Sequence, residues 1–237
     1  MKPEESSTIS FDEFAEDYDA ALEKGISVSG EDKNFFAKAR VDWLASCLAN
    51  QGIFPKEILD FGCGTGSAIP HMLQAFENSY ISGVEVSAKS IEVARSCHVS
   101  ERVNFFLMED FQMTNRYDLV FCNGVFHHIP IPERQIALKK ILNCLRAGGI
   151  FAFWENNPWN PGTRVVMSRI PFDRDAQTLS PISARRMIQS NGFQLLQMDF
   201  RFYFPRSLSF LRFTEKILTK IPLGAQYQIL AMKPKEF

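Results

Sequence analysis

Short apolar runs and longer amphipathic segments alternate through the middle of the chain. Three of the five runs, each of four to six residues, are followed, after a turn, by a segment whose apolar side chains recur at spacings of three and four. Strands that are apolar on both faces and alternate with helices are typical of βαβ units on a parallel sheet covered on both sides. The predicted strands are 58–61, 80–85, 103–107, 117–122 and 150–154, and the predicted helices are 67–77, 87–97 and 132–145.

The two ends of the chain follow other patterns. Residues 10–50 repeat apolar side chains at helical spacing, which predicts amphipathic helices there. Towards the carboxyl end, the Ser-Pro pair at 180–181 marks the start of a helix and Gly192 marks its end. Two late strands joined by a long connection would add an antiparallel edge to the sheet. These strands are predicted at 193–204 and 225–232, with a helix between them at 206–220.

The composition is that of a globular protein. The 237 residues are 46% hydrophobic and 22% charged, which excludes disordered and collagen-like classes and predicts a single domain. No apolar run approaches the roughly 18 residues that span a bilayer, and the first residues lack the apolar core of a secretory signal, so we expect a cytoplasmic protein. Five scattered cysteines without a C-x-x-C pair indicate neither a disulfide framework nor a metal site.

Charge divides the chain near residue 156. Residues 1–155 carry 14 basic and 22 acidic side chains, whereas residues 156–237 carry 12 basic and 5 acidic ones. The basic part interleaves arginines with aromatic residues at 200–206. This pattern predicts either a sheet edge with solvated charges or a basic, apolar surface for an amphiphilic or anionic ligand, with peripheral membrane contact. A sequence pI near 6.4 argues against a nucleic-acid partner.

A glycine-rich turn after the first predicted strand carries the strongest chemical signal. Asp60 lies near the end of that strand, and the turn reads Gly62-Cys63-Gly64-Thr65-Gly66. Such a turn at the start of a helix lets a ligand approach the backbone closely. Glu85 ends the second strand, where a carboxylate can accept both hydroxyls of a ribose. Because Glu109-Asp110 follows the third strand, carboxylates at three strand ends predict an adenosine-shaped slot.

With these motifs the chain resembles the class I S-adenosylmethionine-dependent methyltransferases, in the branch that methylates quinones and other small molecules. The matching segments are 59–66, 83–87, 117–129 and 145–151, and residues 11–19 resemble the lid helix of that branch. The resemblance implies a Rossmann-like α/β fold, with a seven-stranded, mostly parallel sheet, helices on both faces and an antiparallel edge strand. It divides the chain into lid helices at 1–50, a cofactor-binding core at 56–155, and a substrate-side insertion with the terminal strands at 156–237.

The resemblance also implies which residues bind S-adenosylmethionine. Asp60 and the glycine turn, including Cys63, would hold the methionine half of the cofactor, and Glu85 would accept the ribose hydroxyls. Many relatives have Gly-Asp-Ala where this chain has Glu109-Asp110-Phe111, so either acid could meet the adenine edge beside Phe111. The remaining implied contacts are adenine with Val86, the methionine amino group with Asn123, and the cofactor carboxylate with Tyr18 and Arg40.

Methyl transfer to a hydroxyl requires a group that takes the proton. His127 and His128 follow the fourth strand, beside the transferred methyl group in this family, and histidine titrates near neutrality. His128 is the first candidate and His127 the second, unless both only pack and cap the following turn. Glu155, after the fifth strand, is the third candidate. We expect a small-molecule acceptor that is methylated at oxygen or, as the second choice, at carbon.

Two other functions share parts of this pattern. An NAD(P)-dependent oxidoreductase would have the same strand, glycine turn and following acid, but Ser67 occupies the place of the third glycine in that fingerprint. A non-catalytic methyltransferase-like binding protein would keep the sheet without needing the glycine turn and Glu85 together. The sequence therefore favours an S-adenosylmethionine-dependent enzyme, and it makes no prediction of the oligomeric state.

Overall fold

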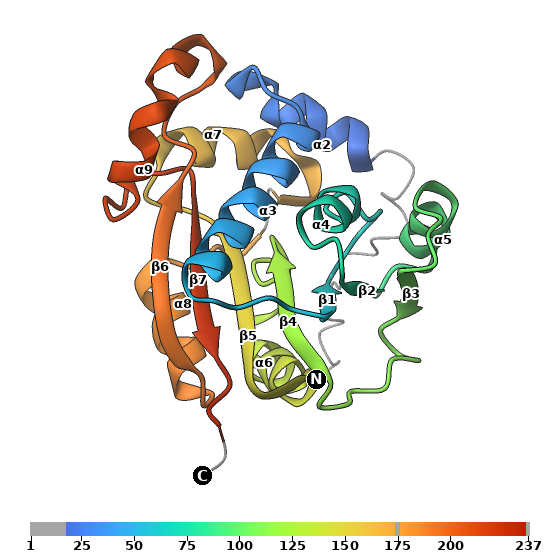
Figure 1. The fold of residues 1–237 in the computed structure, drawn as a ribbon. Coiled ribbons are helices and arrows are strands. Elements are labelled where there is room, and N and C mark those ends of the chain that lie inside the picture. Colours follow the sequence, from blue (N-terminus) through green and yellow to red (C-terminus); the bar gives the residue numbers. More distant parts are fainter. Residues whose placement is uncertain (1–17, 174–175, 236–237) are drawn as a thin grey trace, which may run out of the picture.

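The computed structural model describes residues 18–173 and 176–235, which are built around a seven-stranded sheet (Figure 1). The strands follow the order β3-β2-β1-β4-β5-β7-β6. β7 pairs antiparallel with β5 and β6, and the other neighbours pair in parallel. This confirms the predicted α/β fold with an antiparallel edge. The strands are β1 (Glu57–Phe61), β2 (Tyr80–Glu85), β3 (Val103–Leu107), β4 (Tyr117–Asn123), β5 (Leu145–Asn156), β6 (Gln194–Arg201) and β7 (Gln226–Met232).

Helices surround the sheet, and among the described α-helices the sequence pattern predicts all except the one at Pro161–Arg169, which lies in the insertion. The α-helices are α2 (Tyr18–Ile26), α3 (Lys33–Asn50), α4 (Ile69–Ala75), α5 (Ala88–Cys97), α6 (Arg134–Cys144), α7 (Pro161–Arg169), α8 (Pro181–Ser190) and α9 (Glu215–Leu218). Short 3-10 helices are η1 (Ser27–Ser29), η2 (Ile131–Glu133), η3 (Pro171–Asp173) and η4 (Arg206–Thr214).

The two faces of the sheet carry two separate apolar cores. On one face, α3, α4 and α5 bury side chains such as Leu44 and Ile91 against the strands. On the other face, α6 and α8 do the same with side chains such as Leu138. Successive residues of β1 enter opposite cores, Ile58 the first and Leu59 the second. Burial on both faces explains why the strands are apolar throughout instead of alternating with polar residues.

Side-chain caps set several of the helix starts. Ser180 caps α8 by accepting a hydrogen bond from the Ser183 backbone N–H, as its place before proline predicts. Asp32 caps α3 by accepting from the Phe35 N–H at 2.7 Å. This cap separates α3 from α2, with Gly30 in the left-handed conformation between them. The part of 10–50 that the structure describes is therefore helical, as predicted, but interrupted.

The helix predicted at 206–220 is wrong in its extent. Nine residues form the 3-10 segment η4 and only four form α9. Leu208 has non-helical backbone angles. The buried carboxylate of Glu215 accepts backbone N–H groups of Tyr203 and Phe204 at 3.0 and 3.2 Å, which holds the connecting chain close to α9. This fold leaves Phe210 exposed.

Segments from three parts of the chain meet above the carboxyl ends of the parallel strands (Figure 1). Arg212 of η4 forms an ion pair with Glu31, just before α3, at 2.9 Å. Phe202, directly after β6, contacts Phe36 of α3 with 5.0 Å between ring centroids. α2 packs on α7, where Ile170 approaches the backbone of α2. The lid helices, the insertion and the terminal segment thus enclose one end of the sheet.

Candidate functional site

The glycine turn joins β1 to α4 and leaves one position open. The N–H groups of Gly62 and Cys63 donate to the Val84 carbonyl at 2.8 and 3.1 Å, which holds the turn against β2. Gly62 has φ of 73°, and a Cβ there would lie 2.4 Å from Val125 Cγ2. Gly64 has φ of 52°, but a Cβ there would meet no atom within 4 Å. Packing explains the first glycine, whereas the second faces space that a ligand could fill.

Glu85 braces this turn from the end of β2. One carboxylate oxygen accepts the Gly64 N–H at 3.1 Å, and the other accepts the N–H groups of Val86 and Ser87 at 2.7 and 3.2 Å. The carboxylate that is predicted to bind the ribose is therefore in direct contact with the glycine turn. Cys63 is buried within the turn, and burial raises the pKa of its thiol well above the ordinary value. Gly66 packs against the ring of His98.

Asp60 is a buried carboxyl group beside Glu85. Its side chain is almost inaccessible at 3% exposure. The pKa of Asp60 is raised to about 7, mainly by burial and also by the negative charge of Glu85. The positive charge of Arg40 opposes this shift. A cation bound here would favour the ionised form of Asp60.

The adenine side of the predicted slot is apolar and open. Val86 is 61% exposed although it lies next to the buried turn. Phe111 contacts Phe106 with 5.7 Å between ring centroids, so its ring is fixed at this end. Glu109 and Asp110 are both exposed, and their contacts favour neither acid as the adenine partner.

A cavity of about 560 Å³ adjoins this slot at the loop after β4. Asn123, Gly124 and Arg40 line it, and Val125 of the same loop packs on Gly62. Arg40 donates to the side-chain oxygen of Gln226 at 2.9 Å. The loop after β4 therefore contacts the glycine turn on one side and the cavity on the other.

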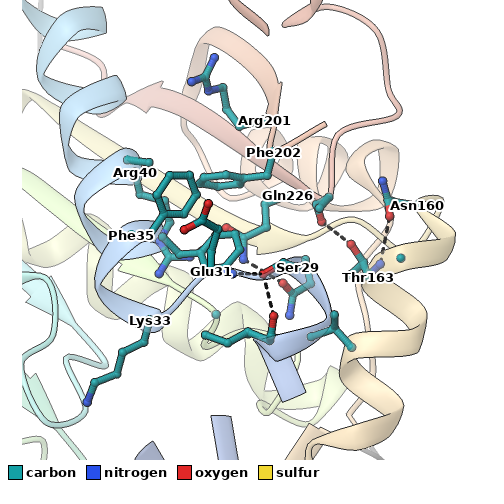
Figure 2. Close-up of a pocket in the computed structure, with 18 of the residues that line it drawn as sticks. Ser29, Glu31, Lys33, Phe35, Arg40, Asn160, Thr163, Arg201, Phe202 and Gln226 are labelled. Carbon is teal, nitrogen blue, oxygen red and sulfur yellow. Dashed lines mark hydrogen bonds between the residues drawn. The ribbon is translucent and has the colours of Figure 1, made fainter. Parts of the chain in front are cut away.

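The cavity has aromatic walls and internally paired charges (Figure 2). Phe35 and Phe202 lie with ring centroids 6.4 Å apart. Arg212 lies over the Phe35 ring and pairs with Glu31. Arg201 points away from these side chains in Figure 2, and its guanidinium lies over the Trp43 ring. The space is suited to a ligand with an apolar ring or chain.

A buried polar cluster occupies part of the cavity wall. His127 Nδ1 lies 2.7 Å from Glu155 Oε2, and its Nε2 lies 3.3 Å from Asp173 Oδ1. His128 Nε2 is also 3.3 Å from Asp173 Oδ1. The other Glu155 oxygen accepts the N–H groups of Phe126 and His127 at 2.9 and 3.3 Å. The three residues with candidate acid–base roles therefore meet at one place, together with Asp173.

The pKa values in this cluster are set by competition between burial and neighbouring charge. Burial alone would lower the pKa of His127, but the Glu155 and Asp173 carboxylates outweigh it and raise the pKa to about 10. Burial alone would raise the pKa of Asp173, but hydrogen bonds from both histidines lower it to about 2. Burial lowers the pKa of His128, and the hydrogen bond to Asp173 opposes this shift. Charge of both signs is therefore buried in this cluster.

Comparison with known proteins finds similarity to methyltransferases. Residues 59–151 match a family model described as a methyltransferase domain. A ubiquinone biosynthesis O-methyltransferase of Aeromonas salmonicida is 26% identical over 188 residues, which cover 72% of this chain and 76% of that protein. An uncharacterized Synechococcus protein is 32% identical over 100 residues, but the match spans only 24% of its length.

Solved structures agree with this result at the level of the fold. An S-adenosylmethionine-dependent methyltransferase from Archaeoglobus fulgidus superposes with a TM-score of 0.59 at 13% identity, covering 81% of this chain and 94% of that one. These matches support the class I S-adenosylmethionine-dependent methyltransferases as the family of this chain, with the methyltransferase domain at residues 59–151. A [4+2]-cyclase, SpnF, superposes equally well, with a TM-score of 0.60 at 18% identity and coverage of 82% and 81%. The methyltransferase fold is thus also found in a protein that is named for another reaction.

Several residues that line the cavity could not be identified from the sequence. Asp173 lies in η3 and no motif marks it, so its meeting with the two histidines depends on tertiary packing. Phe202 has φ of 65°, which is unusual for a bulky residue, and the interleaved aromatic stretch was the one signal for it. Tyr18 is the first residue of α2, and its side chain lies outside the described residues. The roles assigned to individual site residues stay predictions.

The buried carboxyl of Asp60 gives a pH prediction for the ligand-free protein. Its folded pKa of about 7 lies above the ordinary carboxyl value of 3.8, so ionisation opposes folding as the pH rises between these values. Asparagine cannot ionise. We therefore expect Asp60→Asn to gain stability relative to the parent from pH 4 to pH 7, by at most about 4 kcal/mol. Urea unfolding of both proteins at several pH values measures this, and a constant difference would contradict it.

Proposed function

We propose that the protein transfers a methyl group from S-adenosylmethionine to an oxygen of a small, amphiphilic or anionic acceptor, with carbon as the second choice. The observation that supports this most strongly is the open side of Gly64, braced by Glu85 and joined to a separate cavity by the loop after β4. One binding slot and one adjoining cavity are what a two-substrate transfer requires.

The residues of the slot fit the cofactor. Asp60 is a buried carboxyl that would pair with the cationic amino-acid end, and the open Gly64 backbone would allow close approach. Glu85 would accept the ribose hydroxyls, while exposed Val86 would cover one face of the adenine. Asn123 and Arg40, at the mouth of the cavity, would bind the amino and carboxylate groups. S-adenosylmethionine supplies an activated methyl group on a sulfonium sulfur.

The cavity would hold the acceptor against that methyl group. Phe35 and Phe202 provide an apolar wall, and the paired charges of Glu31 and Arg212 lie at its edge. Positioning of two reactants is the main contribution that such an enzyme makes, with effects of up to about 7–11 kcal/mol in the best models. A hydroxyl acceptor gives up its proton as its oxygen forms the new bond to carbon.

His128 is the group that the contacts favour for taking this proton. His127 has both ring nitrogens next to carboxylates, and the Glu155 carboxylate faces four N–H groups of the protein. His128 lines the cavity and is oriented by Asp173. His127 and Glu155 would then position the cluster instead of contacting the acceptor.

Two variants with the same backbone strain test the cofactor slot. Gly64 and Gly52 have φ of 52° and 69°, and a Cβ at either position meets no atom within 4 Å. Alanine should therefore cost each protein a similar amount, about 1 kcal/mol. We expect Gly64→Ala to weaken binding of S-adenosylhomocysteine by at least about tenfold, or 1.4 kcal/mol, because its Cβ enters the slot. Calorimetric titration measures the affinity.

Gly52→Ala is the matched control, because Gly52 lies in the turn after α3. It should bind S-adenosylhomocysteine as the parent does. Equal affinity of the two alanine variants would contradict the placement of the cofactor, and failure of the parent to bind would contradict the proposed function itself.

We also propose that an amphiphilic acceptor reaches the cavity from an anionic lipid surface. In the described residues no helix has the length and hydropathy to cross a bilayer. However, η4 and α9 expose Phe210, Phe213 and Ile217 at 68%, 76% and 81%. Exposed Arg206 and Lys216 lie among them, which gives the mixed apolar and basic character that binds anionic lipid. Arg212 of η4 lines the cavity, and α9 stands at the outer edge of the molecule (Figure 1). A cytoplasmic location and a single domain fit this proposal and stay predictions.

Vesicle sedimentation tests the lipid surface. We expect the parent to bind vesicles of phosphatidylglycerol and phosphatidylcholine more strongly than vesicles of phosphatidylcholine alone. Replacing Phe213 and Ile217 together by serine removes two exposed apolar side chains and should weaken binding about tenfold or more. Val99→Ser is the control, because Val99 is 89% exposed outside this surface. Unchanged sedimentation of the double variant would contradict the proposal.

A further inference from the structure

Three side chains of the cavity wall have the spacing of metal ligands. One ligand atom from each of His127, His128 and Asp173 lies within 4.8 Å of the others. The closest distances, from Nε2 of each histidine to Asp173 Oδ1, are both 3.3 Å. Ligands bound to zinc at about 2.1 Å in a tetrahedral arrangement lie about 3.4 Å apart. Two of the three separations between ligand atoms therefore already match those around a bound ion.

Glu155 provides a second observation that points to a metal. A histidine ligand commonly has its other ring nitrogen bonded to a carboxylate, which fixes the ring and its tautomer. His127 Nδ1 lies 2.7 Å from Glu155 Oε2, and this leaves Nε2 directed to Asp173. Glu155 is itself fixed by backbone N–H groups and is 1% exposed. The carboxylate that would orient the ligand is thus already in place.

The charge and location of the cluster fit a dication. Asp173 and Glu155 bring two carboxylates into a buried region, at 7% and 1% exposure. An ion bound at His127 Nε2 would take the place of the proton held between this nitrogen and Asp173 Oδ1. His127, His128 and Asp173 all line the acceptor cavity, so any further ligand of the ion would come from that space.

We infer that His127, His128 and Asp173 bind one divalent first-row transition ion, with its remaining positions open to the acceptor cavity. Two histidines and one carboxylate suit Zn²⁺, Fe²⁺ and related ions better than Mg²⁺ or Ca²⁺. Three protein ligands with an open position are the arrangement of catalytic, rather than structural, metal sites.

The catalytic meaning of this site rests on the proposed methyl transfer, whereas ion binding does not. An acceptor hydroxyl bound to the ion would have a lower pKa and release its proton to solvent. The oxygen lone pair would then form the new bond to the methyl carbon, and the electron pair of the breaking carbon–sulfur bond would stay on sulfur. With the ion present, His128 is a ligand and no longer takes the proton.

Titration of the chelator-treated protein with Co²⁺ tests the site, because cobalt gives visible absorption bands that report its nitrogen and oxygen ligands. We expect one Co²⁺ per chain in the parent. Asp173→Asn and His128→Gln each alter one ligand and should weaken Co²⁺ binding by more than about tenfold. His71→Gln is the control, because His71 lies on α4 and contacts Asn34. Circular dichroism establishes that each variant is folded.

The outcomes separate this inference from the proposed function. Absence of Co²⁺ bands in the parent, or equal binding by Asp173→Asn, His128→Gln and His71→Gln, overturns the metal site. S-adenosylhomocysteine is titrated into the same samples. A parent that binds S-adenosylhomocysteine but not Co²⁺ overturns the metal site alone, and a parent that binds Co²⁺ but not S-adenosylhomocysteine overturns the proposed methyl transfer alone.

Discussion

The buried carboxylate of Glu155 holds together the two halves of the candidate site. It accepts hydrogen bonds from the backbone N–H groups of Phe126 and His127, which follow β4. It also accepts one from the backbone N–H of Asn156, at the end of β5. This fixes the loop that packs Val125 on the glycine turn and carries the histidines to the cavity. A buried carboxylate is costly unless it is hydrogen-bonded, and here backbone N–H groups and the ring of His127 contact both of its oxygens. The position of the cofactor slot relative to the cavity therefore depends on this one group.

The cofactor side and the acceptor side differ in how much the sequence predicts. The β1 strand, the glycine turn and Glu85 are close in sequence, and their contacts follow from the register of two parallel strands. The positions of the strands and most of their boundaries were also predictable, because buried parallel strands have a strong apolar signal. The cavity depends instead on residues far apart in the chain. Asp173 and Phe202 meet their partners through packing of η3 and of the turn after β6, and no local motif encodes these contacts.

Fold and reaction are separate conclusions for this chain. A cyclase with the same fold shows that the sheet alone does not fix the chemistry. Methyl transfer is therefore inferred from the contents of the site, above all from an open glycine position beside a carboxyl that is costly to ionise. Burial of Asp60 is unfavourable in the ligand-free protein and would be offset by a bound cation. The slot is thus arranged for a ligand that carries positive charge.

A thermal shift experiment with S-adenosylhomocysteine, S-adenosylmethionine, NAD and NADP tests the central claim most directly. A ligand at about one hundred times its dissociation constant adds about 2.7 kcal/mol to the free energy of unfolding. For a chain of this size each kcal/mol raises the melting temperature by about 2–4 °C, so a bound cofactor should raise it by about 5–10 °C. We expect this rise with S-adenosylhomocysteine and S-adenosylmethionine and not with the nicotinamide cofactors. A rise with NAD or NADP alone, or with none of the four ligands, would contradict the assignment of the slot.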